Sequence, residues 1–214
     1  MKQVGRPSKQ DLLNNNDHAR ERLLLAAQQC FSRYPYQRVT TRMLASKADV
    51  NPALIRYYFI NKEGLYRAMF DELTDLMIQE VINLSQEQPL SIDILPRAFY
   101  HVVEHQPYFP MLLIRELILG CGKSKQILLD KIKNQQSPYL RRMIETLKSQ
   151  GTVRTDISTE ALYIHILSLC LFPWLIKNDM DDILSVSIAD QFPGELLTQS
   201  IELLKHGCSP QKII

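Results

Sequence analysis

Residues 40–59, TTRMLASKADVNPALIRYYF, carry two short helical patterns separated by a tight turn. Thr40 or Thr41 can cap the first helix, because either hydroxyl can accept a hydrogen bond from a free N–H of the first turn. The apolar side of this helix is formed by Met43, Leu44 and Ala48. Asp49 suits the turn, since it adopts the left-handed backbone conformation at lower cost than most other residues with a side chain.

The second helix is expected to begin near Pro52 and to end at about Tyr58. Asn51 is a good N-cap, and proline suits the first helical position that follows it. Leu54 or Ile55 turns inward together with Phe59. A short helix, a turn of about four residues and a second helix form the anatomy of a helix-turn-helix. In that motif the first helix braces against the phosphate backbone, and the second fits the major groove of DNA.

The residues around this turn supply candidate contacts to DNA. Arg56 is the side chain suited to bidentate recognition of guanine, and the other polar side chains suit phosphate groups. Lys62 also lies near a helix N-terminus, which favours an anion. A helical hairpin without a role on DNA is the alternative. The candidate set is Thr40, Thr41, Arg42, Asn51, Pro52, Ala53, Arg56, Tyr57, Tyr58 and Lys62.

Residues 19–70 resemble the DNA-binding domain of the tetracycline-repressor (TetR) family. The shared anchors, in order, are Ala26-Ala27 and Phe31, Thr40-Thr41, Ala48-Asp49-Val50-Asn51, Tyr57-Tyr58-Phe59 and Lys62-Glu63-Gly64-Leu65. Pro35 and Asp49 stand where the family has glycine, and Arg56 stands where many members have tyrosine, so base preference is not carried over. The resemblance implies a ligand-responsive homodimer, usually a repressor and sometimes an activator, on a palindromic operator.

Helical spacing dominates the whole chain, which predicts an all-α fold. We expect a flexible N-terminal arm over residues 1–16, a three-helix DNA-binding domain over 17–65, and a larger helical-bundle domain over 66–214 for effector binding and dimerisation. The first helix is expected from Asp17 to Arg33. The later helices are expected at about 61–86, 92–105, 108–119, 124–150 with a kink or break at Pro138, 158–177 and 194–206, with a further short one in 180–192.

Charge is distributed unevenly along the chain. Residues 1–70 hold 12 Lys and Arg against 5 Asp and Glu, whereas residues 71–214 hold 13 against 18. A basic head on an acidic body favours a polyanionic partner for the head alone. The polar opening of the chain is unlike a signal peptide, and the apolar run 162–176 is short for a membrane span. These features predict a cytoplasmic protein that is associated with the nucleoid when it is bound to DNA.

The resemblance places the dimer interface on helices 158–177 and 194–206, with Leu162, Ile166, Leu169, Phe172, Leu197, Ile201 and Leu204 as its apolar faces. Aromatic residues and methionines before and along these helices exceed what a tight core needs, and they predict a pocket for an apolar or amphipathic effector. The candidate lining is Met69, Leu73, Met77, Phe99, Tyr100, Val103, Tyr108, Met111, Leu112, Arg115 and Trp174. His101 is a further polar group that can orient a ligand.

Two motifs suggest other functions. His101-Val102-Val103-Glu104-His105 has the HxxEH pattern of a zinc peptidase, but the sequence around it announces neither a further carboxylate ligand nor a substrate cleft. Residues 120–124, GCGKS, end like a phosphate-binding loop, but Leu117 stands where its first glycine is required. We therefore expect no enzyme activity, no catalytic or metal-ligating residues and no cofactor. An architectural DNA-binding protein is disfavoured by the long helical body.

Overall fold

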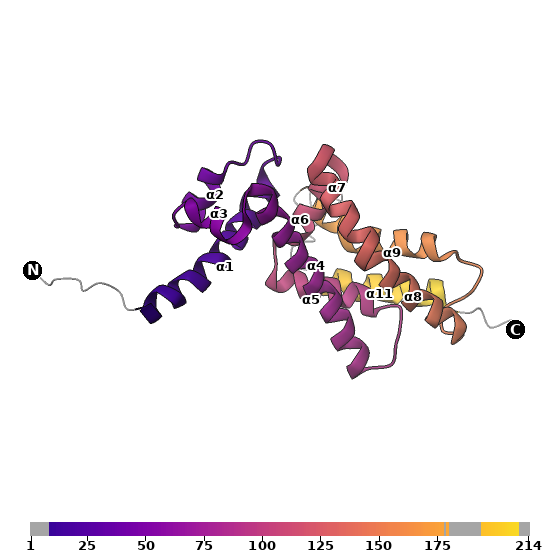
Figure 1. Cartoon of the computed structure of the whole chain (residues 1–214). Coiled ribbons are helices and arrows are strands. Elements are labelled where there is room, and N and C mark those ends of the chain that lie inside the picture. The colour runs from indigo at the N-terminus through magenta and orange to yellow at the C-terminus, as the bar shows by residue number, and fades with distance from the viewer. Residues whose placement is uncertain (1–8, 178, 180–193, 210–214) are drawn as a thin grey trace, which may run out of the picture. The chain divides into compact units, whose positions relative to one another are not determined.

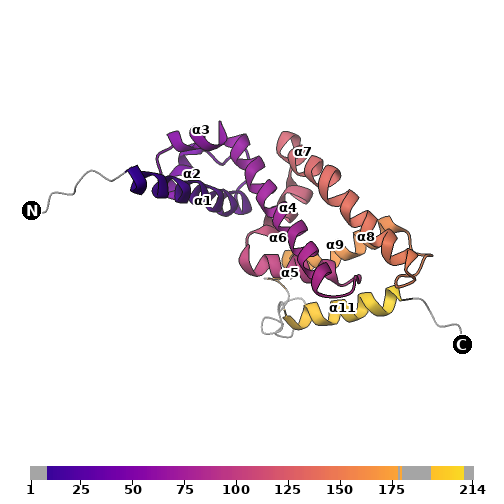
Figure 2. The ribbon, with the colours of Figure 1, turned by 60° about the horizontal axis from the view of Figure 1, so that its bottom comes forward.

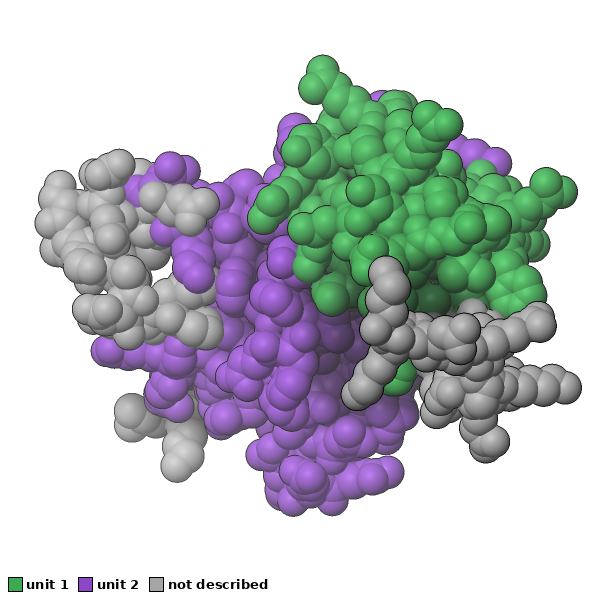
Figure 3. All heavy atoms as spheres, turned by 90° about the vertical axis from the view of Figure 1, so that its left-hand side faces the viewer, with its two compact units in different colours: residues 1–72 green, residues 73–214 purple. Residues whose placement is uncertain are grey.

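The computed structural model describes residues 9–177, 179 and 194–209, and all regular structure among them is helical. This confirms the predicted all-α fold. The chain forms two compact units, residues 1–72 and 73–214 (Figure 3). The boundary falls inside α4 (Lys62–Glu87), a few residues after the division near residue 65 that the sequence suggested.

The first unit contains α1 (Lys9–Arg33), α2 (Thr41–Ala48), α3 (Ala53–Phe59) and the beginning of α4 (Figure 1). Helix α1 begins at Lys9, so residues 9–16 are helical and not part of a flexible arm. Residues 9–16 contain no proline or glycine that would end a helix. Their mostly polar side chains do not suggest a buried helix.

An aromatic cluster ties α1 to α4 in the core of the first unit. The ring of Tyr66 lies 4.8 Å from that of Phe31, 5.0 Å from that of Tyr36 and 5.0 Å from that of Phe70, measured between centroids. Edge-to-face contacts of this kind add to the free energy of burial. On α2, Leu44, Ala45 and Ala48 are buried. Met43 was predicted to share this apolar side, but it is 37% exposed and lies outside the core.

The second unit follows α4 with a series of helices that matches the predicted order (Figures 1 and 2). Helix α5 packs against α9 and α11, and α9 also contacts α6 and α8. The short helix expected in residues 180–192 lies outside the described residues. The helices are α5 (Ile94–His105), α6 (Phe109–Ile114), α7 (Gly122–Lys131), α8 (Ser137–Ser149), α9 (Thr159–Ile176) and α11 (Gly194–Cys208), with π-helical turns η1 (Arg115–Leu119) and η2 (Ile132–Gln136).

Pro138 does not break the helical path between residues 122 and 149. The chain passes from α7 through the π-helical turn η2 and into α8, so that the proline lies in the first turn of α8. Proline is tolerated there, because its missing N–H removes no hydrogen bond from a helix interior. The sequence predicted a kink or a break at Pro138. The wider π-helical turn before the proline accommodates it without a break in the helical path.

A buried carboxylate joins α5 to α11. The side chain of Asp93 is 3% exposed, and it accepts a hydrogen bond from Ser91 and from Arg97 Nε at 2.8 Å, with Lys205 Nζ at 3.2 Å. Burial alone raises the pKa of Asp93, but these hydrogen bonds and the charge of Lys205 outweigh it and lower the pKa to about 2. The carboxylate is therefore ionised, and it fixes α11 against the start of α5.

Helix α9 buries only one stripe within its own chain. Its N-cap is Ser158, as predicted, whose Oγ accepts a hydrogen bond from Ala161 N at 3.1 Å. The buried residues are Thr159, Leu162, Ile166 and Cys170, which make up 22% of the helix. By length and composition α9 is also apolar enough to cross a membrane. Most of its other apolar residues are partly covered, and Ile164, Phe172 and Leu175 are exposed.

Candidate nucleic-acid interface

Helix α2 is capped and ended as the sequence predicts. Thr40 Oγ1 accepts a hydrogen bond from Met43 N at 3.2 Å, which selects Thr40 over Thr41 as the cap. Asp49 has the left-handed conformation with a φ of 52°, and Val50 N then donates to Ala45 O at 3.0 Å. The turn is therefore held by backbone hydrogen bonds, and it leaves Thr41 and Arg42 exposed on the first turn of α2.

Helix α3 presents a distinct inner and outer face. Asn51 Oδ1 accepts a hydrogen bond from Ala53 N at 2.8 Å, which satisfies one free N–H at the start of α3. Ile55 and Phe59 are buried, whereas Leu54 is only partly covered, so that Ile55 is the inward residue of the predicted pair. The outer face carries Asn51, Pro52, Ala53, Arg56 and Tyr57, the last of which is 74% exposed.

This outer face matches the requirements of a recognition helix. It combines a guanidinium, an amide and an aromatic hydroxyl on a short helix whose other side is anchored in a core. Tyr58 is partly covered, and its ring lies 4.8 Å from that of Tyr57. A helix of this kind fits the major groove, where arginine and asparagine can distinguish base pairs.

Two of the three N–H donors of the Lys62 ammonium group are used within the fold. Its Nζ donates hydrogen bonds to Tyr36 O and Val39 O, both at 2.9 Å, and lies 4.1 Å from the centroid of the Tyr36 ring. Burial lowers the pKa of Lys62. Lys62 therefore fastens the loop between α1 and α2 to the start of α4, and its phosphate contact stays a prediction.

The connection between α3 and α4 is unusually tight. Ile60 has a φ of 70°, and Asn61 N donates to Phe59 O at 2.7 Å across it, which defines a γ-turn. Asn61 Oδ1 then accepts from Gly64 N at 2.9 Å and caps α4, as predicted. A Cβ at Gly64 would lie 1.9 Å from Phe59 O, so the turn in this form requires glycine.

The sequence argument missed two cations of the first unit. Arg38 lies in the loop before α2 and Lys47 lies in its last turn, and both side chains are exposed. Positive charge next to the motif was the signal that would have found them. They join Lys62 as candidate phosphate contacts.

Only some of the residues predicted to line an effector pocket border a common cavity. A mainly apolar cavity of the second unit, with about 60 Å³ of free space, is lined by Met77 and Phe99 from the predicted set. The other predicted residues do not line it: Met111 is 39% exposed, and Tyr100 is buried with its pKa raised to about 12 by burial. The lining that the sequence missed comprises Ile78, Val81, Phe109, Leu113, Tyr139, Leu140, Tyr163, Leu167 and Leu171.

The remaining predicted pocket residues lie elsewhere for simple reasons of packing. Met69 and Leu73 lie on α4 and are fully buried. Val103 and Leu112 are buried in the second unit. The side chains of Tyr108, Arg115 and Trp174 are partly covered. Helical periodicity identifies an apolar face, but it cannot tell which of its residues border a cavity.

The predicted dimer face needs a similar correction. Leu162, Ile166, Ile201 and Leu204 are buried against their own chain, so their side chains are not available to a second copy. Leu169 and Leu197 are partly covered, and Phe172 is 55% exposed. The apolar residues that do face outward are Ile118 on η1, Ile164, Phe172 and Leu175 on α9, and Leu203 on α11.

Comparison with known proteins agrees with this geometry. Residues 23–69 match the family model of bacterial regulatory proteins of the tetR family. The HTH-type transcriptional repressor NicS of Pseudomonas putida is 24% identical over 196 residues, which cover 89% of this chain and 92% of that repressor.

Solved structures share the fold at low sequence identity. A hemolysin II transcriptional regulator has a TM-score of 0.64 at 19% identity, covering 92% of this chain and 99% of its own. A ketosteroid transcriptional regulator of Mycobacterium tuberculosis has a TM-score of 0.65 at 15% identity, covering 90% of this chain and 95% of its own.

A helix-turn-helix with an exposed recognition face, joined to a larger helical unit, defines a DNA-binding transcriptional regulator. The family model, the related repressor and the shared fold narrow that class further. Residues 23–69 form a DNA-binding domain of the tetR family, and the chain as a whole resembles transcriptional regulators that carry this domain.

Proposed function

We propose that this regulator is a repressor that binds an inverted-repeat operator as a homodimer and is released by a small apolar effector. The observation that carries the proposal is the pairing of an exposed, basic recognition helix in one unit with an apolar cavity and an uncovered apolar face in the other. A repressor is favoured over an activator because the related NicS is described as a repressor. The protein acts in the cytoplasm, and on the nucleoid when it is bound to its operator.

Arg56 is the proposed base-reading residue. It is exposed on the outer face of α3, one turn after Pro52 and Ala53 at the helix start, so its guanidinium can reach a guanine edge once α3 lies in the groove. The proposed phosphate contacts are other exposed residues of the same unit, namely Arg38, Thr41, Arg42, Lys47 and Tyr57. Phosphate contacts release counterions and make binding steeply dependent on salt.

A comparison of Arg56→Ala with Arg42→Ala tests this assignment. Binding sites are first selected from genomic fragments with the wild-type protein, and each variant then repeats the selection. We expect Arg56→Ala to lose about 1–3 kcal/mol of discrimination at one position of each half-site. Arg42→Ala should instead weaken binding to all sequences alike. An unchanged base preference for Arg56→Ala would remove Arg56 from the reading face.

The proposed dimer interface is the outward apolar surface of α9, extended by η1 and α11. Ile114, Leu117 and Ile118 form an open groove with Ile164, Leu167, Leu171, Phe172 and Leu175, and its free space is about 270 Å³. An exposed apolar groove is a candidate contact surface for a partner. A second copy is the partner that places two recognition helices on the two halves of a palindrome, about 34 Å apart.

The proposed effector site is the cavity lined by Met77, Phe99, Tyr139 and Tyr163 with their aliphatic neighbours. About 60 Å³ is room for a few water-sized groups, since one water needs about 10–15 Å³ by the same measure. An organic effector must therefore widen the cavity by moving the surrounding helices. Its lining predicts an apolar molecule, which the hydroxyl groups of Tyr139 and Tyr163 can orient.

Filling the cavity tests this site. Leu140→Trp should block apolar effectors while the protein still binds the operator, because Leu140 lines the cavity but not the proposed dimer groove. Leu129→Trp, at an exposed position on α7, should behave as the wild type. A library of apolar acids and neutral amphiphiles is screened for release of the selected operator. If only polar sugars or inorganic ions release it, the effector site lies elsewhere, whereas operator binding stands unaffected.

A further inference from the structure

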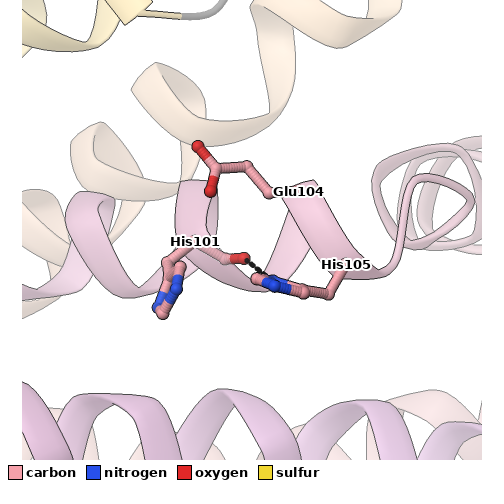
Figure 4. Close-up of side chains that lie close together, drawn as sticks. All are labelled: His101, Glu104 and His105. Carbon is pink, nitrogen blue, oxygen red and sulfur yellow. Dashed lines mark hydrogen bonds between the residues drawn. The ribbon is translucent and has the colours of Figure 1, made fainter.

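The C-terminal turns of α5 carry a cluster of metal-ligating side chains outside the sites described above. His101, Glu104 and His105 are exposed, and each offers one ligand atom within 4.8 Å of the others (Figure 4). The two imidazole rings are one helical turn apart, with 5.3 Å between their centroids. Histidines at positions i and i+4 of a helix lie on one face, which is the spacing used by helical metal sites.

The hydrogen bonds of the two rings determine which nitrogens are available. His101 Nδ1 lies 2.6 Å from Glu80 Oε1, and His105 Nδ1 lies 3.1 Å from His101 O. A carboxylate and a carbonyl oxygen only accept, so both Nδ1 atoms carry the proton and donate. In the neutral rings, each Nε2 therefore has a free lone pair, which is the form that a metal ion binds.

Glu80 gives this pair a feature that an ordinary pair of surface histidines lacks. It lies on α4, with its side chain 16% exposed, and it holds the His101 ring from the side opposite to Nε2. A carboxylate that receives the second N–H of a ligating histidine fixes the orientation of the ring and strengthens it as a ligand. Beside it is a shallow hollow of about 140 Å³ whose lining includes Glu80 and both histidines but not Glu104; the other lining residues are Leu76, Val102 and Gln106.

We propose that His101 Nε2, His105 Nε2 and a Glu104 carboxylate oxygen bind a divalent transition-metal ion of the zinc type, with water completing the coordination. Zinc takes nitrogen ligands at about 2.0–2.1 Å, so the ligand atoms must move closer together than they now lie, and exposed side chains can do so by rotation. Glu104 is occupied as a ligand, so the site is not a peptidase centre. An ion there strengthens the link from α5 through His101 to Glu80 of α4.

Zinc titration of the full chain tests the proposal. After treatment with a chelator, the protein is titrated with Zn²⁺ alone in competition with a zinc-binding dye. We expect one ion per chain at this site, about tenfold or more weaker binding for His101→Ala and for His105→Ala, and about tenfold weaker binding for Glu80→Gln, which removes no ligand. Thermal unfolding provides the second readout, because an ion that binds only the folded state raises Tm.

His206→Ala is the matched control. His206 is exposed on α11 and its Nδ1 bonds to Glu202 O at 2.8 Å, in the same local geometry as His105, but no second histidine lies one turn before it. This variant should keep the zinc affinity and the rise in Tm. The proposal is overturned if the double variant His101→Ala/His105→Ala binds zinc as tightly as the wild type, or if the wild-type chain binds none.

Discussion

The exposed surfaces of α3 and α9 differ in chemistry although both helices are anchored on one side in a core. Helix α3 turns Arg56, Tyr57 and Asn51 outward, whereas α9 turns Ile164, Phe172 and Leu175 outward. Charged and hydrogen-bonding groups suit a hydrated polyanion, and an apolar face suits another apolar face. The difference supports the proposal that DNA binds the first unit and that a second copy of the chain binds the second.

The two units also differ in how they hold a charge. In the first, the Lys62 ammonium is bound by two backbone carbonyls, and in the second, the Asp93 carboxylate is bound by Arg97 and Lys205. Both charges are used within the fold. Each fastens segments of the fold, so it is the exposed surface of each unit that selects its partner.

The largest effect is expected from a charge on the apolar face of α9. Phe172→Asp should give monomers, because near a twofold axis each new carboxylate lies close to its symmetry mate and is desolvated without a partner, at a cost of several kcal/mol. Light scattering measures the mass, and gel shift measures binding to the operator, which we expect to fall to the level of a single half-site. Leu129→Asp, exposed on α7, should remain dimeric. A dimeric Phe172→Asp protein would place the interface elsewhere.

Replacement of Lys62 should damage the first unit itself. Lys62→Met leaves Tyr36 O and Val39 O without their donor and should cost about 2–4 kcal/mol of unfolding free energy. Urea denaturation followed by circular dichroism measures it, with Lys47→Met as the exposed control. If Lys62→Met unfolds at the wild-type urea concentration and yet binds all DNA more weakly, Lys62 contacts phosphate after all.

Acid should weaken the second unit through Asp93. Its pKa is about 2 in the folded chain and 3.8 as the ordinary value, so the stabilisation is complete above about pH 4 and is lost as the pH falls toward 2. The shift corresponds to about 2 kcal/mol. Unfolding free energies at pH 5 and pH 2.5 should differ by roughly this amount more in the wild type than in Asp93→Asn. Asp75→Asn, on the exposed side of α4, should retain the full difference.

The smallest effect is expected at the turn between α3 and α4. Ile60 is 79% exposed and has a positive φ, which is strained for a β-branched residue, so Ile60→Gly should relieve strain without loss of packing. Part of the gain is offset by the flexibility of glycine in the unfolded chain, which leaves about 1 kcal/mol. Thermal unfolding should show a higher Tm. A lower Tm would mean that the Ile60 side chain has a contact on which the turn depends.

Local chemistry made the helix-turn-helix predictable from sequence. Thr40, Asp49 and Asn51 each act on atoms within a few residues of themselves. Asp49 and Asn51 were placed correctly, and Thr40 was one of the two predicted candidates for the cap. The internal role of Lys62 was not predicted, because its partners lie 23 and 26 residues earlier in the chain and no local pattern indicates them. The positive charge was visible, but its neighbours were not.

The second unit was less predictable for a related reason. Its helices follow from periodicity and capping, yet periodicity does not distinguish a residue that faces its own core from one that faces a partner, as Leu162 and Ile164 on α9 show. The cavity has the same difficulty, because its lining combines residues from α4 to α9 that only the tertiary packing brings together.

Footprinting on a selected genomic fragment tests the central claim most directly, since it reports on α3 and on the dimer together. The account predicts two protected half-sites of inverted sequence about one duplex turn apart, with Arg56→Ala altering the preferred base in both. A single protected half-site at saturating wild-type protein, or protection without sequence preference, would contradict it.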